Sequence, residues 1–370
     1  MKSERSFAEY SSRLREHINA IDRSESGFNQ LALALFALQY AHVEPYRRFC
    51  LGRRVLPDKI ICWTEIPAVP TAAFKELEMT SLPVGERAAV FHSSGTMEQR
   101  PSRHHHSVES QAIYEASLLP WFKAHVIPDA DRFTFVILTP APVLTSHSSL
   151  VHMFQVVRRA FGSSDSLFAG GMNVDGGWTL DFDATLRALQ KATETSRPAA
   201  LLGTAFSFVH LVDDLAAKDV RLELPPGSRA LETGGYKGRS RSLPRDDLHA
   251  LITDRLGIPA SHIVCEYGMC ELSSQAYDRQ ARKGEGVARD EARVFRFPPW
   301  ARARIVSPEN GREIAEGETG LIQVYDLANV RSVMAIQTED LAIRRGAGFE
   351  LIGRAALAEP RGCSLMEMRS

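Results

Sequence analysis

The first fifty residues carry apolar side chains at helical spacing. Apolar positions recur three and four residues apart in the stretch FNQLALALFALQYAHVEPYRRFC, and Pro45 interrupts the pattern. This spacing predicts helices over residues 8 to 49. Because such helices have an apolar face, we expect them to pack as a layer on the rest of the chain.

From residue 133 the pattern changes to apolar runs followed by helical segments. The continuous apolar run FTFVILTPAP precedes SSLVHMFQVVRRAFG, a helix that opens with serines suited to capping. The same unit recurs in PAALLGTAFSFVHLVDDLAAKD and in SRALETGGYKG with RDDLHALITDRLG, and a further strand is expected at HIVCEYG. Strands that alternate with helices predict a mostly parallel sheet. The stretch GGMNVDGGWTLDFD predicts a hairpin.

Beyond about residue 293 the pattern is typical of short strands. Val, Ile and aromatic residues are frequent in ARVFRFPPWARARIVSP, TGLIQVYDLA and FELIGR, and the turn sequences ENG and EGETG separate them. We therefore expect an α/β fold, with parallel-rich sheets layered with helices and a small β subdomain.

Composition restricts the class of function. The chain has 370 residues, 44% of them hydrophobic, which is enough for a large core. Its 44 basic residues nearly balance 45 acidic ones, so we expect no charge-driven binding of nucleic acid. The polar N-terminus and the lack of any run of about eighteen apolar residues predict no membrane span and a cytoplasmic location. Five widely spaced cysteines are typical of reduced thiols, and no CxxC pair suggests a zinc site.

Two glycine-bearing loops are candidates for binding phosphate or a flat ligand. Four residues, Ser93, Ser94, Gly95 and Thr96, directly follow the apolar run AAVFH, and their hydroxyl and backbone N–H groups can wrap a phosphate. The second loop, ETGGYKG, places paired glycines at a strand end, where a flat ligand can lie against the backbone. An ordinary turn is the alternative for both loops.

Two further loops carry an aromatic or acidic candidate. In CEYGMCELSSQ, Tyr267 can stack on a base and Glu271 can coordinate Mg²⁺; a buried aromatic and a capping glutamate are the alternative. In IQTEDLAI, Asp340 can accept hydrogen bonds from ribose hydroxyls, and a strand-ending turn is the alternative.

Together and in this order, the four loops resemble the adenylate-forming ligase superfamily. The resemblance is closest to the acyl-protein synthetases of the LuxE type, which supply fatty acid for bacterial bioluminescence. It rests on the stretches SSGT…PSRH, SSLVHM, TGGYKGRSRSL, EYGMCELSSQAYD, PPWARARIVSPENGREIAEGETGLIQVYDLANVRSVMAIQTEDLAI and GR…RGCSL. The similarity extends from about residue 30 to the C-terminus.

The resemblance implies ATP and Mg²⁺ as cofactors and gives roles to particular residues. Positions that match the family's ATP-binding motifs are Ser93, Ser94, Gly95 and Thr96 for the phosphates, Gly234, Gly235, Tyr267 and Gly268 for adenine, and Asp340 for ribose. By the same resemblance Glu271 would bind Mg²⁺, and Arg354 of IGR would lie near the ribose or phosphate.

The chemistry that the resemblance implies has two steps. A carboxylate, here expected to come from a fatty acid, attacks the α-phosphorus of ATP, which releases pyrophosphate and leaves an acyl-adenylate. A thiol then attacks this mixed anhydride, and in this branch it belongs to the cysteine of RGCSL, here Cys363. Arg361 can lower the pKa of that thiol and so favour the nucleophilic thiolate. The implied partner is an acyl-acceptor protein, either an acyl reductase or a carrier protein.

The resemblance also implies a domain organisation. Residues 1–340 would form the ATP- and acyl-binding domain, with 1–50 as its helical layer. Ligases of the wider superfamily continue past the GR hinge with a sizeable mobile domain, whereas this chain stops sixteen residues after Arg354. We therefore expect a truncated C-terminal domain, a remnant at 341–370 whose Cys363 is a tethered acceptor in place of coenzyme A.

Two alternatives stay open. The enzyme can instead pass an alkyl or aryl acid to coenzyme A or to a carrier-protein pantetheine, with Cys363 uninvolved. The chain can also be a nucleotide-binding scaffold without turnover. Met97, Glu98 and Cys270 favour the scaffold, because the family usually has a threonine and a glycine in the first loop and a threonine before the glutamate. The acid and the oligomeric state are not identified.

Three other features resemble a metal site, a reactive thiol and a binding platform, and none of them is expected to have that role. The imidazoles of His104, His105 and His106 are adjacent and point in different directions, which argues against a metal site and leaves substrate recognition open. Cys265 lies in an apolar run and is expected to be a small buried hydrophobe, and Trp300 is expected to be a packing anchor.

Overall fold

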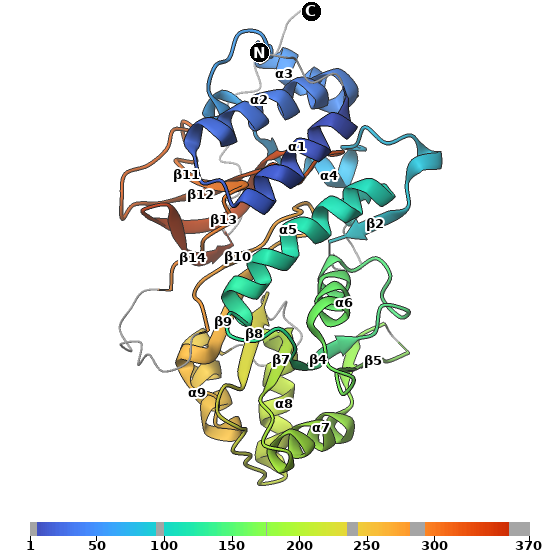
Figure 1. Cartoon of the computed structure of the whole chain (residues 1–370). Helices are drawn as coiled ribbons and strands as arrows, with labels where there is room; N and C mark the ends of the chain where they lie inside the picture. Colours follow the sequence, from blue (N-terminus) through green and yellow to red (C-terminus); the bar gives the residue numbers. More distant parts are fainter. Residues whose placement is uncertain (1–5, 94–99, 175, 235–242, 282–292, 355–370) are drawn as a thin grey trace, which may run out of the picture.

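The computed structural model describes residues 6–93, 100–174, 176–234, 243–281 and 293–354 (Figure 1). Its α-helices are α1 (Phe7–Ala20), α2 (Glu25–His42), α3 (Glu44–Gly52), α4 (Ala73–Glu76), α5 (Val108–Val126), α6 (Ser149–Phe161), α7 (Phe182–Glu194), α8 (Ala205–Ala217) and α9 (Arg245–Leu256). Short 3-10 helices cover Trp63–Glu65, Val84–Glu86 and Ala260–His262. None of the described helices combines the length and the apolar character that crossing a bilayer requires.

The strands fall into three sheets. They are β1 (Val69–Pro70), β2 (Ala89–His92), β3 (Arg103–His106), β4 (Thr134–Pro140), β5 (Leu167–Met172), β6 (Trp178–Leu180), β7 (Ala199–Thr204), β8 (Arg229–Thr233), β9 (Ile263–Tyr267), β10 (Ala276–Tyr277), β11 (Ala301–Val306), β12 (Thr319–Asp326), β13 (Ala335–Arg345) and β14 (Gly348–Arg354).

Helices α1 to α3 form the N-terminal layer that the periodicity predicts. The hydroxyls of Ser6 and Ser24 cap α1 and α2 by accepting a hydrogen bond from a backbone N–H of the first turn. Pro45 lies in the first turn of α3, where its missing N–H costs no helical hydrogen bond, so the chain breaks between α2 and α3. Figure 1 shows these helices, in blue, above the sheet that contains β11 to β13.

The larger sheet has the strand order β10-β9-β8-β7-β4-β5-β6, and its five central strands are parallel. Its side chains alternate between two cores: Ile137 of β4 packs with α5 and α6, whereas Val136 packs with α7, α8 and α9. Burial on both faces explains why these strands read as continuous apolar runs. The predicted parallel sheet is confirmed, as is the hairpin, in which β5 and β6 pair antiparallel.

The smaller sheet is the predicted β subdomain. Strands β11, β12, β13 and β14 pair antiparallel in that order, and β1 joins β13 in parallel. This sheet shares one core with α1 to α3. Trp300, only 1% exposed, lies in that core and donates a 2.7 Å hydrogen bond from Nε1 to Ser117 Oγ on α5. The prediction that Trp300 is a packing anchor is therefore confirmed.

The boundary expected at residue 340 falls inside strand β13, which continues to Arg345 and pairs with β14. The division into residues 1–340 and 341–370 stays a prediction. Residues 355–370, with Cys363, lie outside the described part of the chain.

Candidate active site

Tyr267 and Asp340 bring the two large sheets together at one point. Tyr267 is the last residue of β9 in the larger sheet, and its hydroxyl donates a 2.8 Å hydrogen bond to Oδ2 of Asp340 on β13. Burial raises the pKa of the Tyr267 phenol well above its usual value, so the hydroxyl keeps its proton and acts as the donor. Its ring meets Phe295, Phe297 and Phe349 edge-on, which fixes its orientation.

Asp340 has a second charged neighbour. Strands β13 and β14 place Arg354 directly opposite Asp340, with Nε 3.8 Å from Oδ1 and the arginine side chain 81% exposed. Burial raises the pKa of Asp340, while the Tyr267 hydrogen bond and Arg354 act in the opposite direction. The pair therefore offers a carboxylate acceptor beside a solvent-facing cation, a combination suited to hydroxyl and phosphate groups.

Glu271 lies in the turn that follows β9 and is 4% exposed. Cys270 donates from Sγ to Glu271 Oε2 at 3.2 Å, and Asn329 Nδ2 donates to the Glu271 backbone oxygen at 2.8 Å. Asp326 accepts hydrogen bonds from the Ser273 N–H and the Ser274 hydroxyl, which fix the same turn. The carboxylate is thus held in place before any ligand arrives.

The β2–β3 hairpin is tied to this turn. Nδ1 of His104 on β3 lies 2.9 Å from the backbone oxygen of Cys270. Burial lowers the pKa of His104 to about 4, so its ring is neutral and donates from Nδ1. At the end of the hairpin, Ser93 Oγ accepts a 2.9 Å hydrogen bond from the Ser102 N–H. Ser93 directly follows β2, which is paired with β3, and His104 attaches β3 to the turn that carries Glu271.

The histidine run follows the alternation of a strand. His104 and His106 lie on one face of β3 with ring centroids 4.2 Å apart, and both are buried. His105 points to the other face, where the nearby charges include Arg87 and Glu78. The run therefore packs and positions the hairpin, and its role in substrate recognition stays a prediction.

Gly234 and Gly268 directly follow the neighbouring strands β8 and β9. Gly234 has φ +72°, and a Cβ placed there would meet no atom of the described residues within 4 Å, so those residues leave its backbone open to a ligand. At Gly268 a Cβ would lie 2.2 Å from Glu266 Oε1, so a side chain there would require the Glu266 carboxylate to move. Glu266 itself accepts a hydrogen bond from Thr233, and burial raises its pKa to about 7.

The predicted residues thus fall into two groups. The structure gathers Gly234, Tyr267, Gly268, Glu271, Asp340 and Arg354 around the ends of β8, β9 and β14, with Ser93 on the adjoining hairpin. The predictions for Ser94, Gly95, Thr96, Gly235 and Cys363 lie outside the described residues. Sequence reasoning missed the buried Thr233–Glu266 pair; the polar residues ending two expected parallel strands were the available signal.

The fold is similar to that of solved ligases. An open conformation of 2-hydroxyisobutyryl-CoA ligase, in complex with 2-HIB-AMP and CoA, matches with a TM-score of 0.62 and 14% identity over 90% of this chain and 76% of that chain. The same ligase in the postadenylation state, in complex with 2-HIB-AMP, gives a TM-score of 0.61 and 15% identity over 88% and 67%. This likeness shows that the fold is that of the adenylate-forming ligases.

Sequence comparison identifies the family. The long-chain-fatty-acid–luciferin-component ligase of Aliivibrio fischeri is 23% identical over 356 residues, covering 91% of this chain and 86% of that protein. Its counterpart from Vibrio harveyi is 21% identical over 353 residues with the same coverage. The profile of the acyl-protein synthetase family LuxE matches residues 15–369. Because this match spans almost the whole sequence, the chain belongs to the LuxE family of acyl-protein synthetases and is a ligase.

Proposed function

We propose that this ligase uses ATP and Mg²⁺ to activate a long-chain fatty acid, and that Cys363 then carries the acyl group to a partner protein. The observation that carries the proposal is the convergence of Tyr267, Glu271, Asp340 and Arg354, all matched to family motifs, from separate strands and turns. The family and the printed names of the two relatives support the class of acid and the ligase reaction.

The described groups suit a nucleotide. Oδ1 of Asp340, beside the exposed Arg354, can accept hydrogen bonds from ribose hydroxyls. The backbone at Gly234, which no other described residue covers, can let a planar base lie close to the end of β8, next to Tyr267. Arg354 can offset phosphate charge, since a guanidinium forms strong hydrogen bonds with phosphate oxygens.

Glu271 is the residue that would hold Mg²⁺. Mg²⁺ prefers carboxylate and phosphate oxygens, and Glu271 is a buried carboxylate whose turn is fixed by Cys270, Asn329 and Asp326. When bound, the ion supplies charge neutralisation to the phosphates. The part played by the protein is to keep the carboxylate oriented so that no reorganisation is needed during the reaction.

The proposed reaction has two steps, transfer of the adenylyl group to the fatty acid and then transfer of the acyl group to Cys363. A fatty-acid carboxylate oxygen bonds to the α-phosphorus of ATP while the bond to the β-phosphate oxygen breaks, and pyrophosphate leaves. The Cys363 sulfur then bonds to the acyl carbon, the acyl–phosphate bond breaks and AMP leaves; the thiol proton goes to solvent. A thiolate attacks such an anhydride readily, and an acceptor on the same chain gains a high effective concentration.

ATP–pyrophosphate exchange across a panel of carboxylic acids tests the first transfer. We expect exchange that depends on Mg²⁺ and is fastest with long-chain fatty acids. Cys363→Ser should retain exchange, because it alters only the acceptor, whereas Glu271→Gln should reduce it by roughly 10²-fold or more, as loss of a charge-stabilising group does. Absence of exchange with every acid would favour the nucleotide-binding scaffold.

The acceptor is tested separately. With coenzyme A or a carrier protein present, the proposal predicts that acyl transfer to protein is lost in Cys363→Ser. If Cys363→Ser forms acyl-CoA or acyl-carrier protein as fast as the unaltered enzyme does, the acceptor is a pantetheine thiol and the role proposed for Cys363 is wrong.

A further inference from the structure

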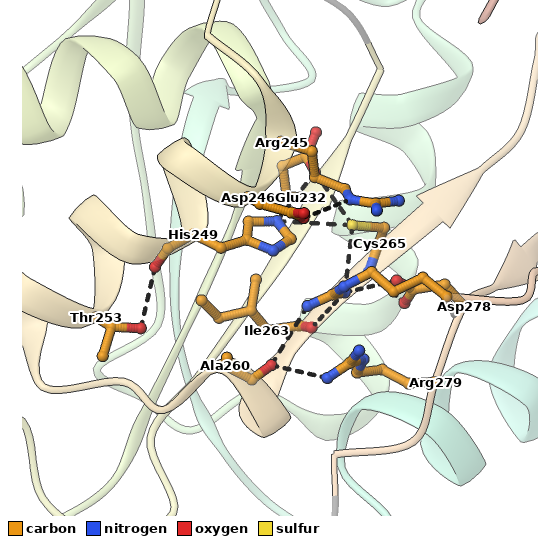
Figure 2. A network of polar contacts seen from close by, with 11 residues as sticks. Glu232, Arg245, Asp246, His249, Thr253, Ala260, Ile263, Cys265, Asp278 and Arg279 are labelled. Carbon is orange, nitrogen blue, oxygen red and sulfur yellow. Dashed lines mark hydrogen bonds and ion pairs between the residues drawn. The ribbon is translucent and has the colours of Figure 1, made fainter. Parts of the chain in front are cut away.

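Three buried side chains converge behind the ends of β8 and β9. Glu232 and Cys265 are paired across the two parallel strands, and both face helix α9, which contributes His249 (Figure 2). The thiol of Cys265 lies 3.2 Å from Glu232 Oε2 and 3.7 Å from His249 Nε2, and Nε2 lies 3.5 Å from Oε2. Each side chain is less than a tenth exposed.

The position of Cys265 agrees with the expectation but adds contacts to it. Cys265 is buried in a hydrophobic core cluster, as predicted, and its sulfur also contacts Glu232, His249 and Arg293. The three residues lie on two strands and a helix and are far apart in the sequence. They form no short metal-binding motif such as CxxC, so their spacing gave no indication of the cluster.

The arrangement is not that of a cysteine nucleophile with its base. In a catalytic triad the carboxylate contacts one ring nitrogen of histidine and the nucleophile contacts the other. Here Glu232 and Cys265 both face Nε2 of His249. The same nitrogen cannot serve both roles, and the burial of all three residues denies access to a substrate.

The three distances suit a tetrahedral metal ion. Zinc lies about 2.0–2.3 Å from carboxylate oxygen, imidazole nitrogen and thiolate sulfur, so ligand atoms in a tetrahedron are about 3.3–3.6 Å apart. The observed separations are 3.2, 3.5 and 3.7 Å, so one lies within this range and the other two lie about 0.1 Å outside it. The three ligand atoms all lie within 4.8 Å of one another.

We propose that Glu232, His249 and Cys265 form a binding site for one zinc-class divalent cation. A thiolate and an imidazole select zinc or cobalt over the hard cations Mg²⁺ and Ca²⁺. On binding, the Cys265 thiol releases its proton to solvent, and the ion with one thiolate, one carboxylate and a neutral imidazole has no net charge. Such neutrality favours a buried site, and a water completes the fourth position.

The arginine that contacts the Cys265 sulfur does not oppose the cation. Arg293 lies 3.6 Å from the Cys265 sulfur, but its guanidinium is already paired with the buried carboxylate of Asp278. Asp278 also accepts a 2.8 Å hydrogen bond from the Cys265 N–H. The pair can therefore orient the sulfur, as hydrogen-bonded neighbours orient ligands in other metal sites.

The site goes beyond the proposed function and does not rest on it. It would cross-link β8, β9 and α9 on the face of the sheet opposite to Thr233 and Glu266. Glu232 lies two residues before Gly234, and Cys265 lies two residues before Tyr267 at the end of β9. Its expected role is structural, holding the strand ends on which the candidate active site is built.

Cobalt binding to the full chain tests the inference. Reduced protein is stripped with a chelator and titrated with Co²⁺, and thiolate-to-cobalt charge-transfer absorption, bound metal per chain and the midpoint of thermal unfolding are measured. We expect one ion per chain, a thiolate band and a raised midpoint. Cys50→Ala, which removes another buried cysteine, should bind identically, whereas Cys265→Ala should lose the band.

Further variants and a measurement on the unaltered chain make the test decisive. His249→Gln and Glu232→Gln should weaken binding by more than the roughly 10–100-fold that loss of an outer-shell partner costs. Alkylation of the unaltered chain, mapped by peptide mass, should be slowed by zinc more strongly at Cys265 than at the buried Cys50, a readout that needs no variant to fold. A missing thiolate band in the unaltered chain, a band retained in Cys265→Ala, or equal alkylation of Cys265 with and without zinc would overturn the site.

Discussion

The Tyr267 hydroxyl donates a 2.8 Å hydrogen bond to Asp340 Oδ2 and thereby joins the end of β9 to the middle of β13. The two residues come from different sheets, and Arg354 on β14 extends the contact to the surface. This one hydrogen bond thus fixes the position of the Asp340 carboxylate, the group that we propose binds the ribose of ATP. Loss of this bond should affect both stability and ATP use.

Tyr267→Phe should destabilise the protein by about 1.5–3 kcal/mol, since it removes a hydrogen bond to a charged group. The KM for ATP should rise as Asp340 loses its fixed position. Urea unfolding and ATP–pyrophosphate exchange measure the two effects. Tyr277→Phe is the matched control, because the Tyr277 hydroxyl is buried with no hydrogen-bond partner among the described residues. Equal losses in both variants would contradict the role of the Tyr267–Asp340 bond.

Cys270 is predicted to support Glu271. Cys270→Ala removes the thiol donor to Oε2 and should lower the rate of exchange, with a stability loss on the order of 1 kcal/mol. Cys270→Ser keeps a donor at this position and should retain most activity. Exchange rates measured across a range of Mg²⁺ concentrations compare the two variants. If serine and alanine behave alike, the hydrogen bond has no part in positioning the carboxylate.

His104 should make stability depend on pH. Its pKa is lowered to about 4 by burial, against about 6.5 for an unfolded histidine, so the unfolded chain binds more protons between these values. Its stabilising contribution is complete above pH 6.5 and is lost as the pH falls towards 4, by about 3 kcal/mol over the whole window.

His104→Asn tests this dependence, because its amide can still donate to the Cys270 carbonyl but does not titrate. Unfolding free energies measured at pH 7.5 and pH 5 should differ less in the variant than in the unaltered protein. Parallel losses in the two proteins would show that His104 is protonated without cost in the folded state.

Local patterns explain which parts of the fold could be predicted. The apolar run of β4 and the capped helix α6 are properties of short sequences, and the strand–helix order implies the parallel sheet. Tyr267 and Glu271 could be placed together because one ends the strand β9 and the other lies in the turn that follows it. The motif resemblance then added Gly234, Asp340 and Arg354.

The remaining contacts depend on tertiary structure. The Tyr267–Asp340 hydrogen bond forms only because the two sheets come into contact. The hydrophobic periodicity of a short stretch of sequence does not predict that contact. The cluster of Glu232, His249 and Cys265 needs the register of β8 with β9 and the approach of α9 from one face. For that reason the apolar context of Cys265 predicted its burial in the core but not the polar groups that contact its sulfur.

The most direct test of the proposed function is intact and peptide mass spectrometry of the chain after incubation with ATP, Mg²⁺ and a long-chain fatty acid. The account predicts one acyl group per chain in thioester linkage on Cys363, released by hydroxylamine and absent when ATP is omitted. Formation of AMP and pyrophosphate with Cys363 unmodified throughout the reaction would contradict it.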